Sequence, residues 1–193
     1  MINGKKIPLG YDDIIAIFKM RGFTDENQWI RAVADSFPKQ NCAQSVADSA
    51  VLKIDRFRPL NPVEFMVGAG WEIEEQDERS LALSEVNPAD IRLVTILRDG
   101  ESRVIGEERL LRLKAESHVR LDAKIFQAFR DNKDFIPENW KGEAVYFDGT
   151  VFRNSSGDRC VLYLCWGEDD WYWHYRWFKN DWHVRDLSAV LAE

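Results

Sequence analysis

Residues 166–182 read WGEDDWYWHYRWFKNDW and hold five of the eight tryptophans in this 193-residue chain. Successive side chains of a β-strand point to opposite faces, so the stretch separates into two sets. Positions 171, 173, 175 and 177 are Trp, Trp, Tyr and Trp, whereas Tyr172, His174 and Arg176 differ in kind and can all form hydrogen bonds. We therefore predict a strand with one aromatic face that fixes the backbone and a second face whose side chains can vary.

The residues around this strand favour a β-rich C-terminal region. Residues 144–178 are aromatic and β-branched and are broken at DGT, NSSGD and GEDD, a pattern typical of strands joined by turns. In this arrangement Cys160 and Cys165, five residues apart on one strand, lie on opposite faces.

The remaining chain predicts helices and shorter strands. Residues 106–116 form a helix with Leu110, Leu111 and Leu113 inward, and residues 121–132 form a second helix that buries Ile125, Phe126 and Phe129. Strands are expected at 51–57, 80–86 and 91–97, and the acidic residues at 74–78 are interpreted as a solvated face. Two further helices are expected within residues 11–37, and Trp29, Trp71 and Trp140 are assigned to the core. The predicted organisation is a helical N-terminal segment, residues 1–50, followed by one α+β domain, residues 51–193.

Composition excludes several classes of protein. The formal net charge is -7 and no basic block is present, which argues against nucleic acid or an anionic membrane as partner. No stretch approaches the roughly 20 apolar residues of a membrane span, and the N-terminus lacks the apolar core of a signal peptide. Three cysteines without a CxxC pair, and only three histidines, predict free thiols, no metal site and a cytoplasmic location.

Ten motifs distributed along the chain are together typical of one family. They are FRPLNPVEF, ERSLALSEV, LRDGES, GEERLLRLK, RLDAKIFQ, IPENWKG, YFDGTVFR, GDRCVLYL, WYWHYRWF and SAVLA. With these motifs the chain resembles the variable proteins of diversity-generating retroelements over some three quarters of its length, from LKIDR to SAVLA. The first fifty residues carry no such resemblance.

The resemblance implies which positions vary. In these systems a reverse transcriptase copies a template with errors at adenines and the copy enters the 3′ end of the target gene, so Asn codons of the template become diversified positions. By this resemblance the diversified, ligand-binding positions are Cys165, Gly167, Tyr172, His174, Arg176, Asn180, His183, Val184, Arg185 and Asp186. The implied framework is Trp166, Trp171, Trp173, Tyr175, Trp177 and Trp182. Randomising the two adenines of an Asn codon never yields Lys, Gln, Glu, Met or Trp, and none of the ten positions holds one of these residues.

The resemblance also implies a fold and a function. The fold is a C-type lectin fold of the formylglycine-generating-enzyme type, an α+β domain whose last strands display the variable residues. The function is binding of a macromolecular ligand, a protein, without catalysis, metal or cofactor. The identity of the ligand and the oligomeric state stay open.

Two other functions remain as alternatives. The first is an oxidase related to formylglycine-generating enzymes that uses Cys160 and Cys165, although no general base is evident beside either thiol. The second is a calcium-dependent carbohydrate-binding lectin, suggested by the acidic residues of GEDD and ND. The sugar-binding Glu-Pro-Asn and Gln-Pro-Asp motifs are absent from the sequence, and calcium needs six to eight oxygens from a shaped loop.

Overall fold

The computed structural model describes residues 51–192, which belong to the second of two units, Met1–Ser45 and Val46–Glu193, into which the chain divides. The helices predicted within residues 11–37, and Trp29, lie outside the described residues. Residues 51–192 form an α+β structure of short helices and mostly antiparallel strands, as the sequence predicts at that level. Over the same residues, no helix combines the length and the apolar character needed to cross a membrane.

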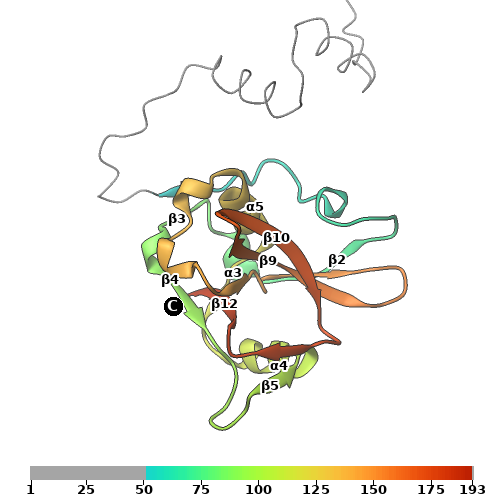
Figure 1. Cartoon of the computed structure of the whole chain (residues 1–193). Coiled ribbons are helices and arrows are strands. Elements are labelled where there is room, and N and C mark those ends of the chain that lie inside the picture. Colours follow the sequence, from blue (N-terminus) through green and yellow to red (C-terminus); the bar gives the residue numbers. More distant parts are fainter. Residues whose placement is uncertain (1–50, 193) are drawn as a thin grey trace, which may run out of the picture. The chain divides into compact units, whose positions relative to one another are not determined.

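An eight-stranded sheet forms the centre of this unit (Figure 1). Six of its strands follow the spatial order β2 (Glu72–Gln76), β8 (Thr150–Arg153), β9 (Arg159–Gly167), β7 (Ala144–Tyr146), β12 (Asp186–Leu191) and β4 (Ile91–Val94). The other two are β10 (Asp170–Trp177), which pairs with β9, and β6 (Val119–Arg120), which pairs with β12. The pair of β7 and β12 is parallel and the others are antiparallel. The strands predicted within residues 144–178 are thus confirmed as β7, β8, β9 and β10.

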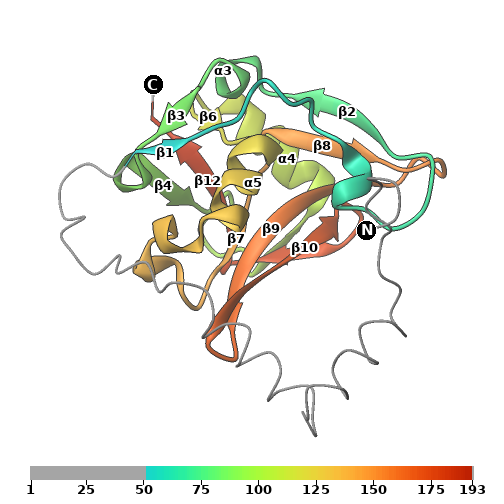
Figure 2. The same cartoon turned by 90° about the horizontal axis from the view of Figure 1, so that it is seen from above.

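The hairpin of β9 and β10 is the longest pairing in the sheet. Its register runs from Asp170 opposite Gly167 to Trp177 opposite Cys160. Two residues, Glu168 and Asp169, form the turn. Their φ angles are 46° and 68°, the left-handed values that a two-residue hairpin turn requires. The other side of β9 bonds to β8 and β7, whereas β10 has no second neighbour within residues 51–192 (Figure 2). Within the described residues, strand β10 is therefore an edge strand.

Helix α5 (Ala123–Asp131) covers one face of this sheet. Its side chains Ile125, Phe126 and Phe129 are fully buried and pack into the same core as Leu162 and Leu164 of β9. The predicted helix at 121–132 and its buried face are confirmed.

Asp122, the N-cap of α5, joins three segments of the chain. Its fully buried carboxylate accepts the backbone N–H groups of Lys124 and Ile125, as capping residues do. It also accepts two bonds from Arg56, of 3.1 and 2.9 Å, and one of 2.6 Å from Ser80 Oγ. The loop after β1 (Leu52–Lys53) is thereby fixed to the start of α5.

Helix α4 (Gly106–Ala115) covers the opposite face, together with a two-stranded sheet of β5 (Arg103–Ile105) and β11 (Asp181–His183) (Figure 1). Leu110 and Leu113 are buried as predicted, but Leu111 is 63% exposed. The prediction for Leu111 is wrong because Leu110 and Leu113 share a helix face that position 111 leaves by about 100°. The fold leaves no room for a side chain at Gly106, because a Cβ there would lie 2.5 Å from the carbonyl oxygen of Phe178.

A buried ion pair ties α4 to the sheet. Arg109, 2% exposed, donates to both carboxylate oxygens of Asp148, at 2.5 and 3.0 Å, and to Ser188 Oγ at 2.5 Å. Its guanidinium lies 4.1 Å from the ring centroid of Trp182. Both terminal nitrogens of the guanidinium are thus hydrogen-bonded and its charge is paired, which is the condition under which a buried ion pair is tolerated.

The segment before β4 differs from the prediction. The strand expected at 80–86 is wrong in its first part, because α3 (Glu78–Leu81) begins there with Asp77 as N-cap, and only β3 (Glu85–Val86) is extended. Strand β3 pairs with β1, and the expected strand at 91–97 is confirmed over residues 91–94 as β4. The short 3-10 helices are η1 (Pro62–Glu64), η2 (Pro88–Asp90), η3 (Lys133–Phe135) and η4 (Glu138–Trp140).

The solvated face predicted for the acidic residues at 74–78 is correct for Glu74 and Glu78, which are exposed, but wrong for Glu75 and Asp77. Asp77 is buried and its carboxylate bonds to Arg79 and Arg120, while Glu75 pairs with Lys114 and Arg120. Burial raises the pKa of Asp77, but hydrogen bonds from Arg79 and Arg120 outweigh it, so the pKa lies below its usual value. Arg79 is a local partner, but Lys114 and Arg120 lie about 40 residues further along the chain, where local sequence gives no sign of them.

Candidate functional site

The strand register places the predicted variable residues in rows across the sheet. Asp186, Ala144, Cys165 and Tyr172 are aligned on β12, β7, β9 and β10. Ser188, Tyr146, Tyr163 and His174 form the next row. Because paired residues share a face, Cys165, Tyr172, His174 and Arg176 lie on one side of the sheet. We call these four residues, with the adjoining loop 183–185, the display face.

The aromatic residues on the opposite side of β10 pack as the alternation predicts. Trp171 is 7% exposed and meets Trp166 edge to face, with ring centroids 5.3 Å apart. Trp177 stacks on Trp71 at 5.6 Å, and Tyr175 contacts the same indole at 5.8 Å. Trp166, Tyr175 and Trp177 are half-buried, so this side holds β10 through ring contacts.

Trp173 is less enclosed than its neighbours. It is 36% exposed, although its ring meets Phe65 at 5.9 Å and Phe126 at 6.0 Å. The guanidinium of Arg130 lies 5.9 Å from its centroid. Trp173 thus packs on the helix side as the alternation predicts, but it stays partly open to solvent because β10 has no further neighbouring strand within residues 51–192.

Trp182 belongs to the core on the display side. It is fully buried, with its ring 4.2 Å from Tyr146 and stacked on Phe178 at 5.9 Å. The guanidinium of Arg176 lies 5.4 Å from the same indole. Trp182 thus supports Arg176 from within the fold.

The ten predicted ligand-binding residues divide by exposure. Six are exposed, namely Tyr172, His174, Asn180, His183, Val184 and Arg185. Cys165, Gly167 and Arg176 are half-buried, and Asp186 is buried. Tyr172, at 48%, and Val184, at 63%, belong to the exposed large hydrophobic residues of the range 51–192.

Asp186 differs from the prediction. Its carboxylate accepts hydrogen bonds from Tyr146 Oη at 3.0 Å and from the backbone N–H of His183 at 2.7 Å, and only 8% of the residue is exposed. These bonds close the turn between β11 and β12. Asp186 therefore fixes the shape of loop 183–185 and does not point outward from it.

Arg176 links β10 to the same segment. Its Nη2 donates to the carbonyl oxygen of Asp181 at 2.5 Å and lies 3.8 Å from the carboxylate of Asp186, while its buried Nε has no acceptor within residues 51–192. Incomplete pairing means that replacing Arg176 removes few bonds.

His174 covers part of the free edge of β10. Its Nδ1 lies 2.7 Å from the backbone nitrogen of Tyr175, whose N–H it can accept, and 2.9 Å from the carbonyl oxygen of Tyr175. Asp170 Oδ1 accepts the backbone N–H of Trp171 in the same way, at 2.7 Å. Odd-numbered residues of β10 point their amides away from β9, so two of these amides are already occupied.

Two further residues on this side, Tyr163 and Tyr146, were not predicted as site residues. Tyr163 lies between Cys165 and Val161 on β9, its ring 4.8 Å from that of Tyr146 and 6.4 Å from that of His174. Burial raises the pKa of both tyrosines, so their hydroxyls stay protonated. The alternation that marks Tyr172 and His174 on β10 would have marked Tyr163 had it been extended to β9.

The two described cysteines lie on opposite faces of β9, as predicted from their spacing. Cys160 is fully buried opposite Trp177, and burial raises its pKa to about 12. Cys165 is half-buried opposite Tyr172, and burial also raises its pKa. Neither environment promotes the thiolate that a nucleophilic cysteine needs.

No grouping of three or more His, Cys, Asp or Glu side chains within residues 51–192 has a geometry suited to a metal ion. Comparison with known proteins adds no assignment, because no family model, curated protein or solved structure matches the chain.

Proposed function

We propose that this protein is a ligand-binding module of the diversity-generating retroelement type, with a C-type lectin fold, and that its display face binds another protein. Loop 183–185 and Asn180 extend the binding surface, and Gly167 lies at the tip of the hairpin beside it. In this proposal Asp186 shapes the loop, and the indoles of β10 and β11 hold the platform.

The observation that carries this proposal is the division of β10 into two faces with different surroundings. Trp171 is 7% exposed, whereas the next residue, Tyr172, is 48% exposed. Because the sheet already fixes their Cα positions, binding requires no further ordering of the backbone at these residues, and exchanging exposed side chains costs the fold little. This is the arrangement that a surface of changing sequence requires.

A protein is the partner that the display face fits best. Tyrosine and arginine are the residues that most often anchor protein interfaces, and histidine adds a donor and an acceptor. The face carries no cluster of lysines and arginines that would suit a nucleic acid, and the chain is acidic overall.

A pair of libraries tests the display face. One library randomises positions 172, 174 and 176, and the control library randomises 171, 175 and 177 of the same strand. Each is displayed on cells as the full chain, sorted for protease resistance and then for binding to a panel of unrelated proteins. We expect most members of the first library to resist protease and some to bind a panel member specifically, and most of the control library to be cleaved. Equal loss in both libraries, or a folded first library without any binder, would refute the proposal.

The origin of the variation is tested in the DNA next to the gene. The proposal requires a reverse transcriptase gene and a near-copy of the 3′ end of this gene, with differences that fall only at adenines of the copy. A locus in which the differences fall on all four bases would contradict it.

A further inference from the structure

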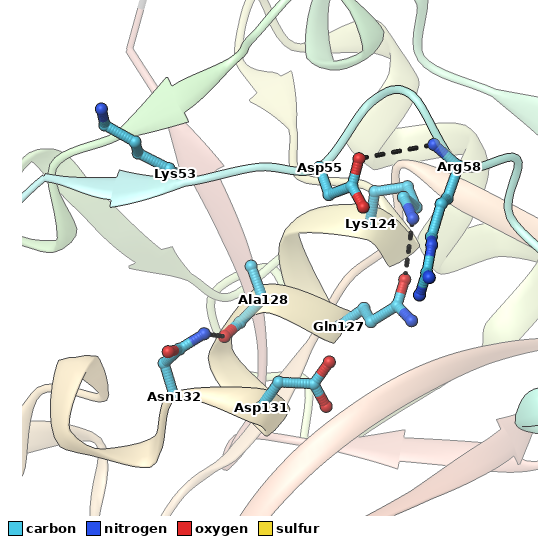
Figure 3. A pocket seen from close by; sticks show the side chains of 8 residues that line it. All are labelled: Lys53, Asp55, Arg58, Lys124, Gln127, Ala128, Asp131 and Asn132. Atoms are coloured by element: carbon cyan, nitrogen blue, oxygen red, sulfur yellow. Dashed lines mark hydrogen bonds between the residues drawn. The ribbon is translucent and has the colours of Figure 1, made fainter.

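A cavity of about 170 Å³ lies away from the display face, between the loop that follows β1 and the outer side of α5 (Figure 3). Eight residues line it: Lys53, Asp55, Arg58, Lys124, Gln127, Ala128, Asp131 and Asn132. Figure 3 shows Arg58 extending from the loop beside Lys124 and Gln127, while Lys53 points away from them.

Lys124 is the unusual residue of this cavity. Only 7% of it is exposed, and its Nζ donates to Gln127 Oε1 at 3.0 Å. Gln127 is itself held by a bond of 3.1 Å from its Nε2 to Glu64. No carboxylate of residues 51–192 lies within 4 Å of Lys124 Nζ, so a buried ammonium with three donors has one neutral acceptor. Buried charges of this kind are ordinarily paired with an opposite charge.

Arg58 brings a second cation to the same wall. Its backbone N–H bonds to Asp55 Oδ1 at 3.4 Å, which holds the loop, but its guanidinium has no hydrogen bond or ion pair within the described part of the chain. Two cations that extend side by side repel each other unless an anion lies between them.

One oxygen of each carboxylate that lines the cavity is already bonded elsewhere. Asp55 Oδ1 accepts backbone N–H groups of its own turn, including that of Phe57 at 3.0 Å, and Asp131 Oδ1 accepts Arg130 Nε at 2.8 Å. Both keep their negative charge beside the cavity, so they disfavour a doubly charged phosphate more than a singly charged carboxylate.

We propose that this cavity binds a small molecule through a carboxylate group, with Arg58 as a two-donor clamp and Lys124 Nζ as the third donor. A planar guanidinium fits a carboxylate through two parallel hydrogen bonds, and the ammonium of Lys124 gains a negative partner, which residues 51–192 do not supply. This site is independent of the display face.

NMR titration of the full-length, ¹⁵N-labelled protein tests the site with sodium acetate, at ionic strength matched by sodium chloride. We expect saturable shifts of the Arg58 Nε–H and Gln127 side-chain signals. Arg58→Gln should weaken acetate at least tenfold, and Arg58→Lys should recover part of the affinity. Arg92→Gln, which removes the same charge from an exposed arginine of β4, should leave binding unchanged. Lys124→Gln should also weaken binding. The dispersion of the backbone amide signals in the spectrum of this variant shows whether it is folded.

Three results would overturn the proposal. They are shifts that grow linearly with acetate, equal weakening by Arg92→Gln, or inorganic phosphate binding more tightly than acetate in the same titration. The last result would assign the cavity to a different class of anion.

Discussion

Replacing Trp171 and Tyr172 by alanine, one at a time, measures the division of β10 directly. The two residues are neighbours on one strand, so both variants lose an aromatic side chain and the same local β propensity. They differ in burial, since 7% of Trp171 and 48% of Tyr172 are exposed.

The expected magnitudes follow from these exposures. An enclosed aromatic side chain buries about 150–250 Å², and truncating it to alanine costs about 3–5 kcal/mol. Tyr172 buries about half its area, a gross gain of about 2 kcal/mol at ~25 cal/mol per Å², from which the entropy of ordering the side chain subtracts about 1 kcal/mol. We therefore expect Trp171→Ala to lower the free energy of unfolding by about 3–5 kcal/mol and Tyr172→Ala by about 1 kcal/mol.

Urea unfolding followed by far-UV circular dichroism gives both values without depending on tryptophan fluorescence. Trp171→Phe is the control, because it keeps an aromatic ring and should recover a large part of the loss. The reasoning fails if Tyr172→Ala costs as much as Trp171→Ala, or if Trp171→Ala leaves the urea midpoint unchanged.

Four further substitutions or measurements test other parts of the structure. Arg109→Met should destabilise the protein by about 3–5 kcal/mol, because it leaves Asp148 buried and unpaired, and the double variant Arg109→Met/Asp148→Leu should recover much of that loss; no recovery would argue against an ion-pair effect. Asp77→Asn should flatten the acid limb of a stability–pH curve, because a lowered folded-state pKa gives stability that is present above the ordinary value of 3.8 and is lost as the pH falls below it; parallel curves would contradict this. Cys160 should resist iodoacetamide at pH 8 until the chain unfolds, as peptide mapping by mass spectrometry would show, and rapid native labelling would mean that the residue is not enclosed. His174→Ala should sediment as a concentration-dependent dimer or larger species because it uncovers the edge of β10, whereas a monomer at all concentrations would remove His174 from that role.

The sequence predicted the elements whose pattern is local. The apolar spacing of residues 121–132 is enough to define α5, and the turn residues between 144 and 178 are enough to separate four strands. Within β10, the alternation from Trp171 to Trp177 correctly assigned each side chain to a face.

What was not predicted depends on contacts between distant residues. Asp186 looks like a loop residue in sequence, and only the parallel pairing of β12 with β7 brings Tyr146 to its carboxylate. The local sequence around Asp77 predicts a solvated carboxylate, because its partner Arg120 lies 43 residues away in the chain. The burial of Lys124 likewise depends on a loop from the start of the domain.

The short contact between His174 and the Tyr175 backbone makes one residue relevant both to ligand recognition and to the solubility of the protein. An exposed sheet edge is a template for other strands, and proteins commonly cover it with side chains. On the proposed function, position 174 contributes to ligand contact and also shields an amide that another chain could otherwise bond. Each residue that diversification places there therefore sets a binding preference together with a tendency to self-associate, so the useful part of the repertoire is limited by which side chains keep neighbouring copies apart.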